Sequence, residues 1–142
     1  MDLNIRFIEK EKMDLIVPLL AQLNPKITHN LLRNRLQDMV LQGYQCVGVL
    51  DDDKLIGISG MWVLVKYYVG KHIEPDNVFL LPEYQGKGIG KLLMNWIFDY
   101  ANSIGCVASE LNCDTDNESG THFWKVQGYE VVGYHFQKQL NR

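Results

Sequence analysis

The stretch that decides the fold is Pro82-Glu83-Tyr84-Gln85-Gly86-Lys87-Gly88-Ile89-Gly90-Lys91-Leu92-Leu93, which follows a short apolar segment and opens an amphipathic helix. Three glycines at alternating positions expose successive backbone N–H groups, and the start of a helix adds a partial positive charge. Such a turn forms a cradle for an anion, and a diphosphate fits it best. The alternative is a glycine-rich turn that binds no ligand, although each glycine costs roughly 1 kcal/mol relative to alanine in a helix.

Two better-known phosphate-binding loops are excluded by their spacing. A P-loop requires G-x-x-x-x-G-K-[ST]. Counting back from Gly90 and Lys91 places Gln85 where the first glycine belongs, and Leu92 replaces the hydroxyl residue that holds Mg²⁺. A dinucleotide fingerprint, G-x-G-x-x-G, fails because Lys91 stands where its third glycine should be. The remaining pattern is Q-x-x-G-x-G, formed by Gln85, Gly88 and Gly90.

Length and composition restrict the class of protein. The chain has 142 residues, of which 46% are hydrophobic, and this suits one compact domain, residues 1–142. A net charge of −3 gives no electrostatic reason to expect binding to nucleic acid or to a membrane. No stretch approaches the roughly 20 apolar residues that cross a bilayer. Met1-Asp2-Leu3-Asn4 has no basic run, so we expect no signal peptide. We therefore expect a soluble, cytoplasmic protein.

The spacing of apolar residues predicts a mixed order of helices and strands. Helices are expected at residues 12–23, 28–41, 89–103 and 117–128, and strands at residues 5–8, 44–50, 55–65, 71–81, 107–113 and within 129–140. One strand crosses to a parallel neighbour through the helix after the glycines, whereas the other strands form antiparallel hairpins. The expected fold class is α+β, with a central, mostly antiparallel sheet of six to seven strands and about four helices.

The Q-x-x-G-x-G pattern resembles the pyrophosphate-binding loop of the GNAT family of N-acetyltransferases, which grip coenzyme A there. The predicted order of elements is also that of this family. The similarity covers roughly Lys54–Leu140 and is strongest over Val78–Leu93. A second, weaker match begins at Asn117 and ends at Tyr129; it looks like the family's N-x-x-A-x-x-[FL]-Y-x-x-x-G-F ending, with one gap shorter than usual.

The resemblance implies that acetyl-CoA is the co-substrate. Its pantetheine arm would pair with the backbone of Leu80 and Leu81 like an added strand, and the amide of Leu80 would polarise the thioester carbonyl. Asn117 would hydrogen-bond the cofactor or act only as a helix cap, and Trp124 would pack against the cofactor arm. The residues expected to hold the diphosphate are Gln85, Gly86, Lys87, Gly88, Ile89, Gly90 and Lys91.

The acceptor amine arrives protonated, so a carboxylate near the thioester is the natural general base. Glu74 and Asp76 alternate on one face of the strand before the loop. Glu74 lies eleven residues before Gln85, where a histone-acetylating branch of the family places its glutamate base, and Asp76 is closer to the thioester. Either carboxylate could instead only cap the strand. The family often reprotonates the thiolate with a tyrosine, but Trp124 stands at that position, so no acid is assigned.

Other reactive side chains give weaker signals. His122 and His135 have no partners at metal-ligand spacing, and the three cysteines have no C-x-x-C spacing, so no metal and no disulfide framework is expected. Cys113 lies on a strand that reaches the same end of the sheet. An acetyl-cysteine intermediate is conceivable there, but a buried, inert thiol is favoured.

The sequence therefore predicts an acetyl-CoA-dependent N-acetyltransferase that moves an acetyl group to a primary amine by direct attack in a ternary complex. A small molecule is the expected acceptor, because no basic or broad aromatic surface suggests docking of a polymer. A protein lysine or N-terminus stays open as the acceptor. Two other classes also stay open, namely a non-catalytic sensor of coenzyme A and a nucleotide-binding regulatory module. Exposed edge strands leave room for a homodimer.

Overall fold

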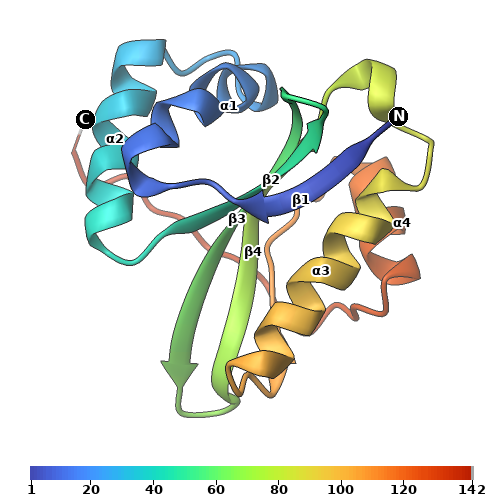
Figure 1. The fold of residues 1–142 in the computed structure, drawn as a ribbon. Coiled ribbons are helices and arrows are strands. Elements are labelled where there is room, and N and C mark those ends of the chain that lie inside the picture. Colours follow the sequence, from blue (N-terminus) through green and yellow to red (C-terminus); the bar gives the residue numbers. More distant parts are fainter. Residues whose placement is uncertain (142) are drawn as a thin grey trace. The chain divides into compact units, whose positions relative to one another are not determined.

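The computed structural model describes residues 1–141, which form two compact units, residues 1–110 and 111–141. The first unit contains the sheet and most of the helices (Figure 1). Its elements are β1 (Leu3–Phe7), η1 (Lys10–Ile16), α1 (Val17–Leu23), α2 (His29–Leu41), β2 (Gln45–Asp51), β3 (Lys54–Lys66), β4 (Gly70–Leu80), η2 (Pro82–Tyr84), α3 (Ile89–Ser103) and β5 (Ala108–Ser109). The second unit contains α4 (Glu118–Val126).

The sheet has the order β1-β2-β3-β4-β5. The first four strands are antiparallel neighbours, and β5 pairs with β4 in parallel, at His72↔Ala108 and Ile73↔Ser109. The predicted crossover through the helix after the glycines is therefore confirmed. Figure 1 shows α1 and α2 on one side of this sheet and α3 on the other. The predicted mixed, mostly antiparallel α+β fold is confirmed.

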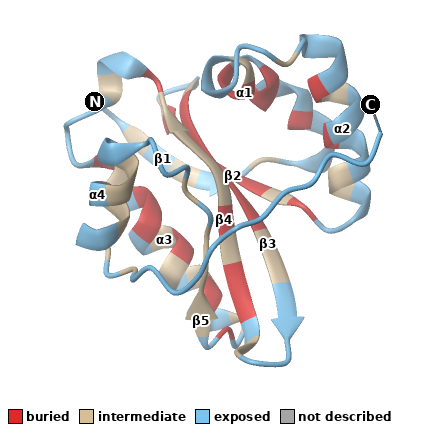
Figure 2. Ribbon diagram, turned by 180° about the vertical axis from the view of Figure 1, so that it is seen from behind, coloured by how far each residue is buried: buried red, intermediate tan, exposed pale blue. Residues whose placement is uncertain are grey.

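The core lies along the middle strands and the inward faces of α1 and α3 (Figure 2). The fully buried aliphatic side chains include Val47, Val49, Ile56, Ile58, Ile73, Leu93 and Ile97. In α3 the buried residues recur every three or four positions, so this helix turns one apolar face inward. In β2 and β3 the residues between the aliphatic ones named above are buried as well, because helices cover both faces of the sheet. Burial of apolar side chains is the largest favourable contribution to folding.

Three local predictions differ from the structure. The helix predicted at residues 12–23 is divided into η1 and α1, because Pro18 lies in the first turn of α1 and cannot donate to a preceding turn. The strand predicted at residues 107–113 is reduced to Ala108–Ser109. Residues 129–141 form neither helix nor strand, so the sheet of the described chain has five strands rather than six to seven. A segment with strand propensity forms a strand only where a neighbour pairs with it.

Within residues 1–141, every helix is too short or too polar to traverse a bilayer.

Candidate active site

The glycine loop presents free backbone donors at the start of α3. Gly86 and Gly88 have φ angles of 73° and 81°, in the left-handed region that favours glycine. Gly88 is the N-cap residue of α3 and has no side chain that could cap the helix. The amides of Ile89, Gly90 and Lys91, in the first turn, have no acceptor inside the helix. The loop therefore has the donors that an anion requires.

Side chains around the loop tie it to the sheet. The Gln85 side-chain amide donates to the carbonyl oxygen of Leu80 at 2.9 Å, which links the loop to the end of β4. Tyr84 donates its hydroxyl to Asp51 Oδ2 at 2.8 Å. This bond raises the pKa of Tyr84 and lowers the pKa of Asp51. The Lys87 ammonium lies 5.9 Å from the centre of the Tyr84 ring, so a cation stands beside the loop.

β4 has an irregularity shortly before the loop. Its pairing with β3 shifts register between Ile58 and Gly60, and Asn77 has a positive φ of 55°. Tyr44 donates its hydroxyl to Asn77 Oδ1 at 3.2 Å, across the same region. On its other edge β4 pairs with β5 at only two positions, the second being Ile73. In the described chain, the rest of this edge of β4 is not covered by β5.

Leu81, directly after β4, has both of its backbone groups hydrogen-bonded within the protein. The Leu81 N–H donates to the Ile56 carbonyl at 2.9 Å, and the Leu81 carbonyl accepts from the Tyr84 N–H at 2.9 Å. Because successive residues of a strand direct their backbone groups to opposite edges, the Leu80 N–H faces away from β3. The backbone of Leu81, predicted to pair with a pantetheine arm, is thus already paired within the protein. Leu80 lies at the open edge.

The two predicted bases have different neighbours. Asp76 accepts a hydrogen bond from the indole N–H of Trp62, with Nε1 3.0 Å from Oδ2. Glu74 Oε2 lies 3.2 Å from the Lys66 ammonium and 2.7 Å from His72 Nε2. Asp76 therefore meets one neutral donor, whereas Glu74 meets an ammonium and an imidazole.

These contacts change the acidity of Glu74. Burial by itself would raise the pKa of Glu74, but the hydrogen bonds from His72 and Lys66 outweigh burial and lower the pKa. The hydrogen bond and the charge of Glu74 raise the pKa of Lys66. Glu74 is therefore held in its ionised form.

Sequence reasoning missed the other members of this cluster. His72 is fully buried, with Nδ1 3.1 Å from the Gly70 carbonyl oxygen, and Nε2 also lies 3.8 Å from Glu110 Oε1. Tyr68 donates its hydroxyl to Glu110 Oε1 at 2.5 Å, which raises the pKa of Tyr68. The alternation of His72 with Glu74 on one strand face was a readable signal. Glu110 joins the cluster only through the parallel pairing of β4 with β5.

The remaining predicted residues lie in the second unit. Asn117 caps α4, since its Oδ1 accepts from the Gly120 N–H at 3.0 Å. The Trp124 ring packs edge-on against Phe123 and Tyr129, with centroid distances of 4.9 and 5.5 Å. A role for Asn117 or Trp124 in cofactor binding stays a prediction.

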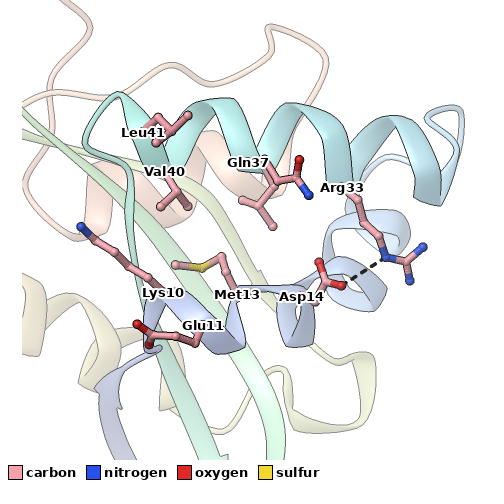
Figure 3. A pocket seen from close by; sticks show the side chains of 9 residues that line it. Lys10, Glu11, Met13, Asp14, Arg33, Gln37, Val40 and Leu41 are labelled. Atoms are coloured by element: carbon pink, nitrogen blue, oxygen red, sulfur yellow. Dashed lines mark ion pairs between the residues drawn. The ribbon is translucent and has the colours of Figure 1, made fainter.

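A groove of about 470 Å³ lies elsewhere in the first unit, between η1 and α2 (Figure 3). Its floor is apolar, with Met13 and Leu36, and an ion pair between Arg33 and Asp14, 3.5 Å apart, lies on its rim. None of the residues that line this groove belongs to the glycine loop or to β4. The groove is therefore separate from the predicted site.

Solved structures share this fold. An integron cassette protein from the mobile metagenome of Vibrio cholerae has a TM-score of 0.84 at 18% identity, and covers 99% of this chain and 94% of its own. Aminoglycoside N-acetyltransferase AAC(6')-Iy in complex with CoA has a TM-score of 0.83 at 16% identity, and the match covers 99% of this chain and 95% of the aminoglycoside N-acetyltransferase. Glucosamine-6-phosphate N-acetyltransferase from Arabidopsis thaliana has a TM-score of 0.74 at 20% identity, and the match covers 99% of this chain and 100% of the Arabidopsis protein. At sequence identities this low, the structural similarity shows only that these proteins share the fold.

Sequence comparison adds a relative and a family. An uncharacterized protein of Mycobacterium leprae is 31% identical over 91 residues, which are 63% of this chain. The chain spans only 24% of the length of that relative. The model of the acetyltransferase (GNAT) family matches residues 17–129, which include the glycine loop, β4 and α4. With most of its length matched, the chain belongs to the GNAT family of acetyltransferases.

Proposed function

We propose that this protein is an acetyl-CoA-dependent N-acetyltransferase that acetylates a primary amine of a small molecule by direct attack in a ternary complex. The observation that carries the proposal is the uncapped start of α3, with Gly88 in the left-handed conformation, in a chain of the GNAT family. The proposal treats residues 1–142 as one acetyltransferase domain, because the family match extends across both units.

The loop and the open edge of β4 would hold the cofactor. The amides of Ile89, Gly90 and Lys91 would bind the diphosphate, and Lys87 would add positive charge. The pantetheine arm would pair with the Leu80 N–H at the open edge of β4, since the backbone of Leu81 and the carbonyl of Leu80 have partners within the chain. A donor directed at a developing oxyanion contributes about 3–4 kcal/mol, and the Leu80 N–H is the amide proposed for this role.

Asp76 is the base that the surroundings favour over Glu74. Its contact with Trp62 fixes the carboxylate and adds no positive charge beside it. The carboxylate would take the proton of the acceptor ammonium, directly or through a water molecule, and the nitrogen lone pair would then attack the thioester carbonyl. The departing thiolate has a conjugate acid with a pKa of about 8.5, so turnover needs no tyrosine at the position of Trp124.

A thermal-shift series followed by an amine screen tests the proposal. Acetyl-CoA should raise the melting temperature more than ATP or NAD does, and mass detection should find acetyl transfer to an amine from a panel of small molecules and peptides. Greater protection by ATP or NAD would overturn the assignment. Protection by acetyl-CoA without transfer to any amine would instead identify a sensor, and acetylation of peptides alone would overturn the small-molecule acceptor.

The assignment of Asp76 as the base is tested by the variant Asp76→Asn. Asp76→Asn should lower kcat several-fold or more, with recovery at high pH where the free amine is abundant, and it should leave acetyl-CoA binding unchanged. An unchanged pH–rate profile for Asp76→Asn would remove Asp76 from this role.

A further inference from the structure

The number of protons shared by His72 and Glu74 follows from the hydrogen bonds of the His72 ring. Its Nδ1 lies 3.1 Å from the Gly70 carbonyl oxygen, and its Nε2 lies 2.7 Å from Glu74 Oε2. A carbonyl and an ionised carboxylate can only accept. Both bonds therefore need a hydrogen, whereas a neutral imidazole has only one N–H. The His72–Glu74 pair thus holds one proton more than a neutral ring beside an ionised carboxylate.

The charges around this pair come from several elements and are balanced. Lys66, at the end of β3, lies 3.2 Å from the same Glu74 oxygen. Glu110, just after β5, lies 3.8 Å from His72 Nε2 and accepts from Tyr68 in the β3–β4 turn. One ammonium and one imidazolium then face two carboxylates. The ligand atoms of His72, Glu74 and Glu110 all lie within 4.8 Å of one another, but the ammonium beside Glu74 Oε2 disfavours a metal ion in the same position.

We infer that His72 is a positioning residue that fixes Glu74 as an anion, so that Glu74 binds the ammonium group of the acceptor while Asp76 accepts the proton. This inference rests on the proposed function. Both donors bind Oε2, so Oε1 can accept from a ligand, and the Glu74 side chain is 21% exposed. The lowered pKa of Glu74 makes it a weak base but keeps it charged. Asp76 follows two residues later on the same face, about 7 Å along the strand.

Nuclear magnetic resonance of the histidine rings tests the proton count without any assay of activity. The chain has four histidines, and the signals missing in His72→Gln identify His72. We expect both ring nitrogens of His72 to carry a proton at neutral pH in the free protein, and one of them to lose it in Glu74→Gln. Added Zn²⁺ should leave these signals unchanged. An unprotonated Nε2, or a stoichiometric Zn²⁺ shift that Glu110→Gln abolishes, would overturn the inference.

Steady-state kinetics test the consequence for the acceptor. The loss of a hydrogen bond to a charged group weakens the affinity for a ligand by roughly a factor of ten or more. His72→Leu should therefore raise KM for the amine about tenfold with a much smaller change in kcat, and Asp76→Asn should mainly lower kcat. His72→Gln keeps an N–H donor, so its KM for the amine should rise less than that of His72→Leu. His135 is exposed, and His135→Gln serves as the control that should leave KM unchanged.

The two proposals fail in different ways. A fall in kcat without a rise in KM for His72→Leu would overturn the anchoring role of Glu74. If the unaltered protein transfers no acetyl group, the proposed function fails, and the ring spectra still decide the proton count on His72. Thermal melting of each variant separates a loss of folding from a loss of binding.

Discussion

Replacement of Gly88 by alanine tests the anion cradle directly. Gly88 has a φ of 81°, and a Cβ built on it would have no heavy atom within 4 Å. The substitution therefore meets no steric obstacle, and its cost is that of a left-handed backbone, roughly 1–2 kcal/mol. For a chain of this size that cost lowers the melting temperature by roughly 3–8 °C. Relaxation of the strain would turn the amides of the first turn of α3 away from a bound diphosphate.

The affinity for acetyl-CoA gives the expected magnitude. Each hydrogen bond to a charged phosphate contributes about 1.5–3 kcal/mol, so the loss of one such bond weakens binding by roughly tenfold or more. Isothermal titration calorimetry of Gly88→Ala with acetyl-CoA, beside the unaltered protein, measures this change. The melting temperature is recorded on the same samples.

Gly105 offers a matched control. It follows the other end of α3, has a φ of 85°, and would also place a Cβ with nothing within 4 Å. Gly105→Ala should therefore lose a similar amount of stability and keep the affinity for acetyl-CoA. If both variants bind acetyl-CoA as tightly as the unaltered protein, the amides after Gly88 do not hold the cofactor and the reasoning is refuted. Equal losses of affinity would mean that strain anywhere in α3 disturbs binding.

Three further predictions concern stability. Thr28→Ala removes the side chain that caps α2 and should cost about 1 kcal/mol in urea unfolding; an unchanged midpoint would contradict the cap. Gly60→Ala places a Cβ against the Tyr44 ring and should cost about 1–3 kcal/mol, whereas Gly133→Ala, with open space around it, should not. The folded-state pKa of Glu74 is lowered from 4.5, so its stabilisation is present above that value and is lost as the pH falls through the folded pKa. Between pH 6 and pH 3, the melting temperature of Glu74→Gln should therefore fall less steeply than that of the unaltered protein. Parallel melting-temperature profiles for the two proteins would contradict this.

Local features of the sequence were sufficient for much of the first unit. The period of apolar residues placed α2 and α3, and the β-rich runs gave the antiparallel hairpins of β2, β3 and β4. The start of α2 is fixed by a local contact, because the Thr28 side chain accepts from the Leu31 N–H. These features depend on neighbours within a few residues, which the sequence shows directly. The positive φ angles of Gly86 and Gly88 belong to the same class, because glycine alone takes that conformation at little cost.

Other features depend on contacts between segments that are far apart in the sequence. Residues 129–140 have strand propensity but form no strand, and Leu81 directs its backbone to Ile56 because of the bulge near Asn77. Propensity and alternation do not reveal which neighbour accepts a strand or where a register shifts.

The sequence by itself therefore determined the family, the glycine loop and the carboxylates before it, because these rest on residue type and short spacing. Only the tertiary structure decided that Glu74 meets Lys66 and His72, that Asp76 meets Trp62, and that Glu110 joins His72. These contacts span up to 38 residues of sequence, from His72 to Glu110, and arise from strand pairing. The ionisation of a carboxylate depends on the charges and donors within a few ångströms, so its chemistry follows from the fold rather than from its position in the chain.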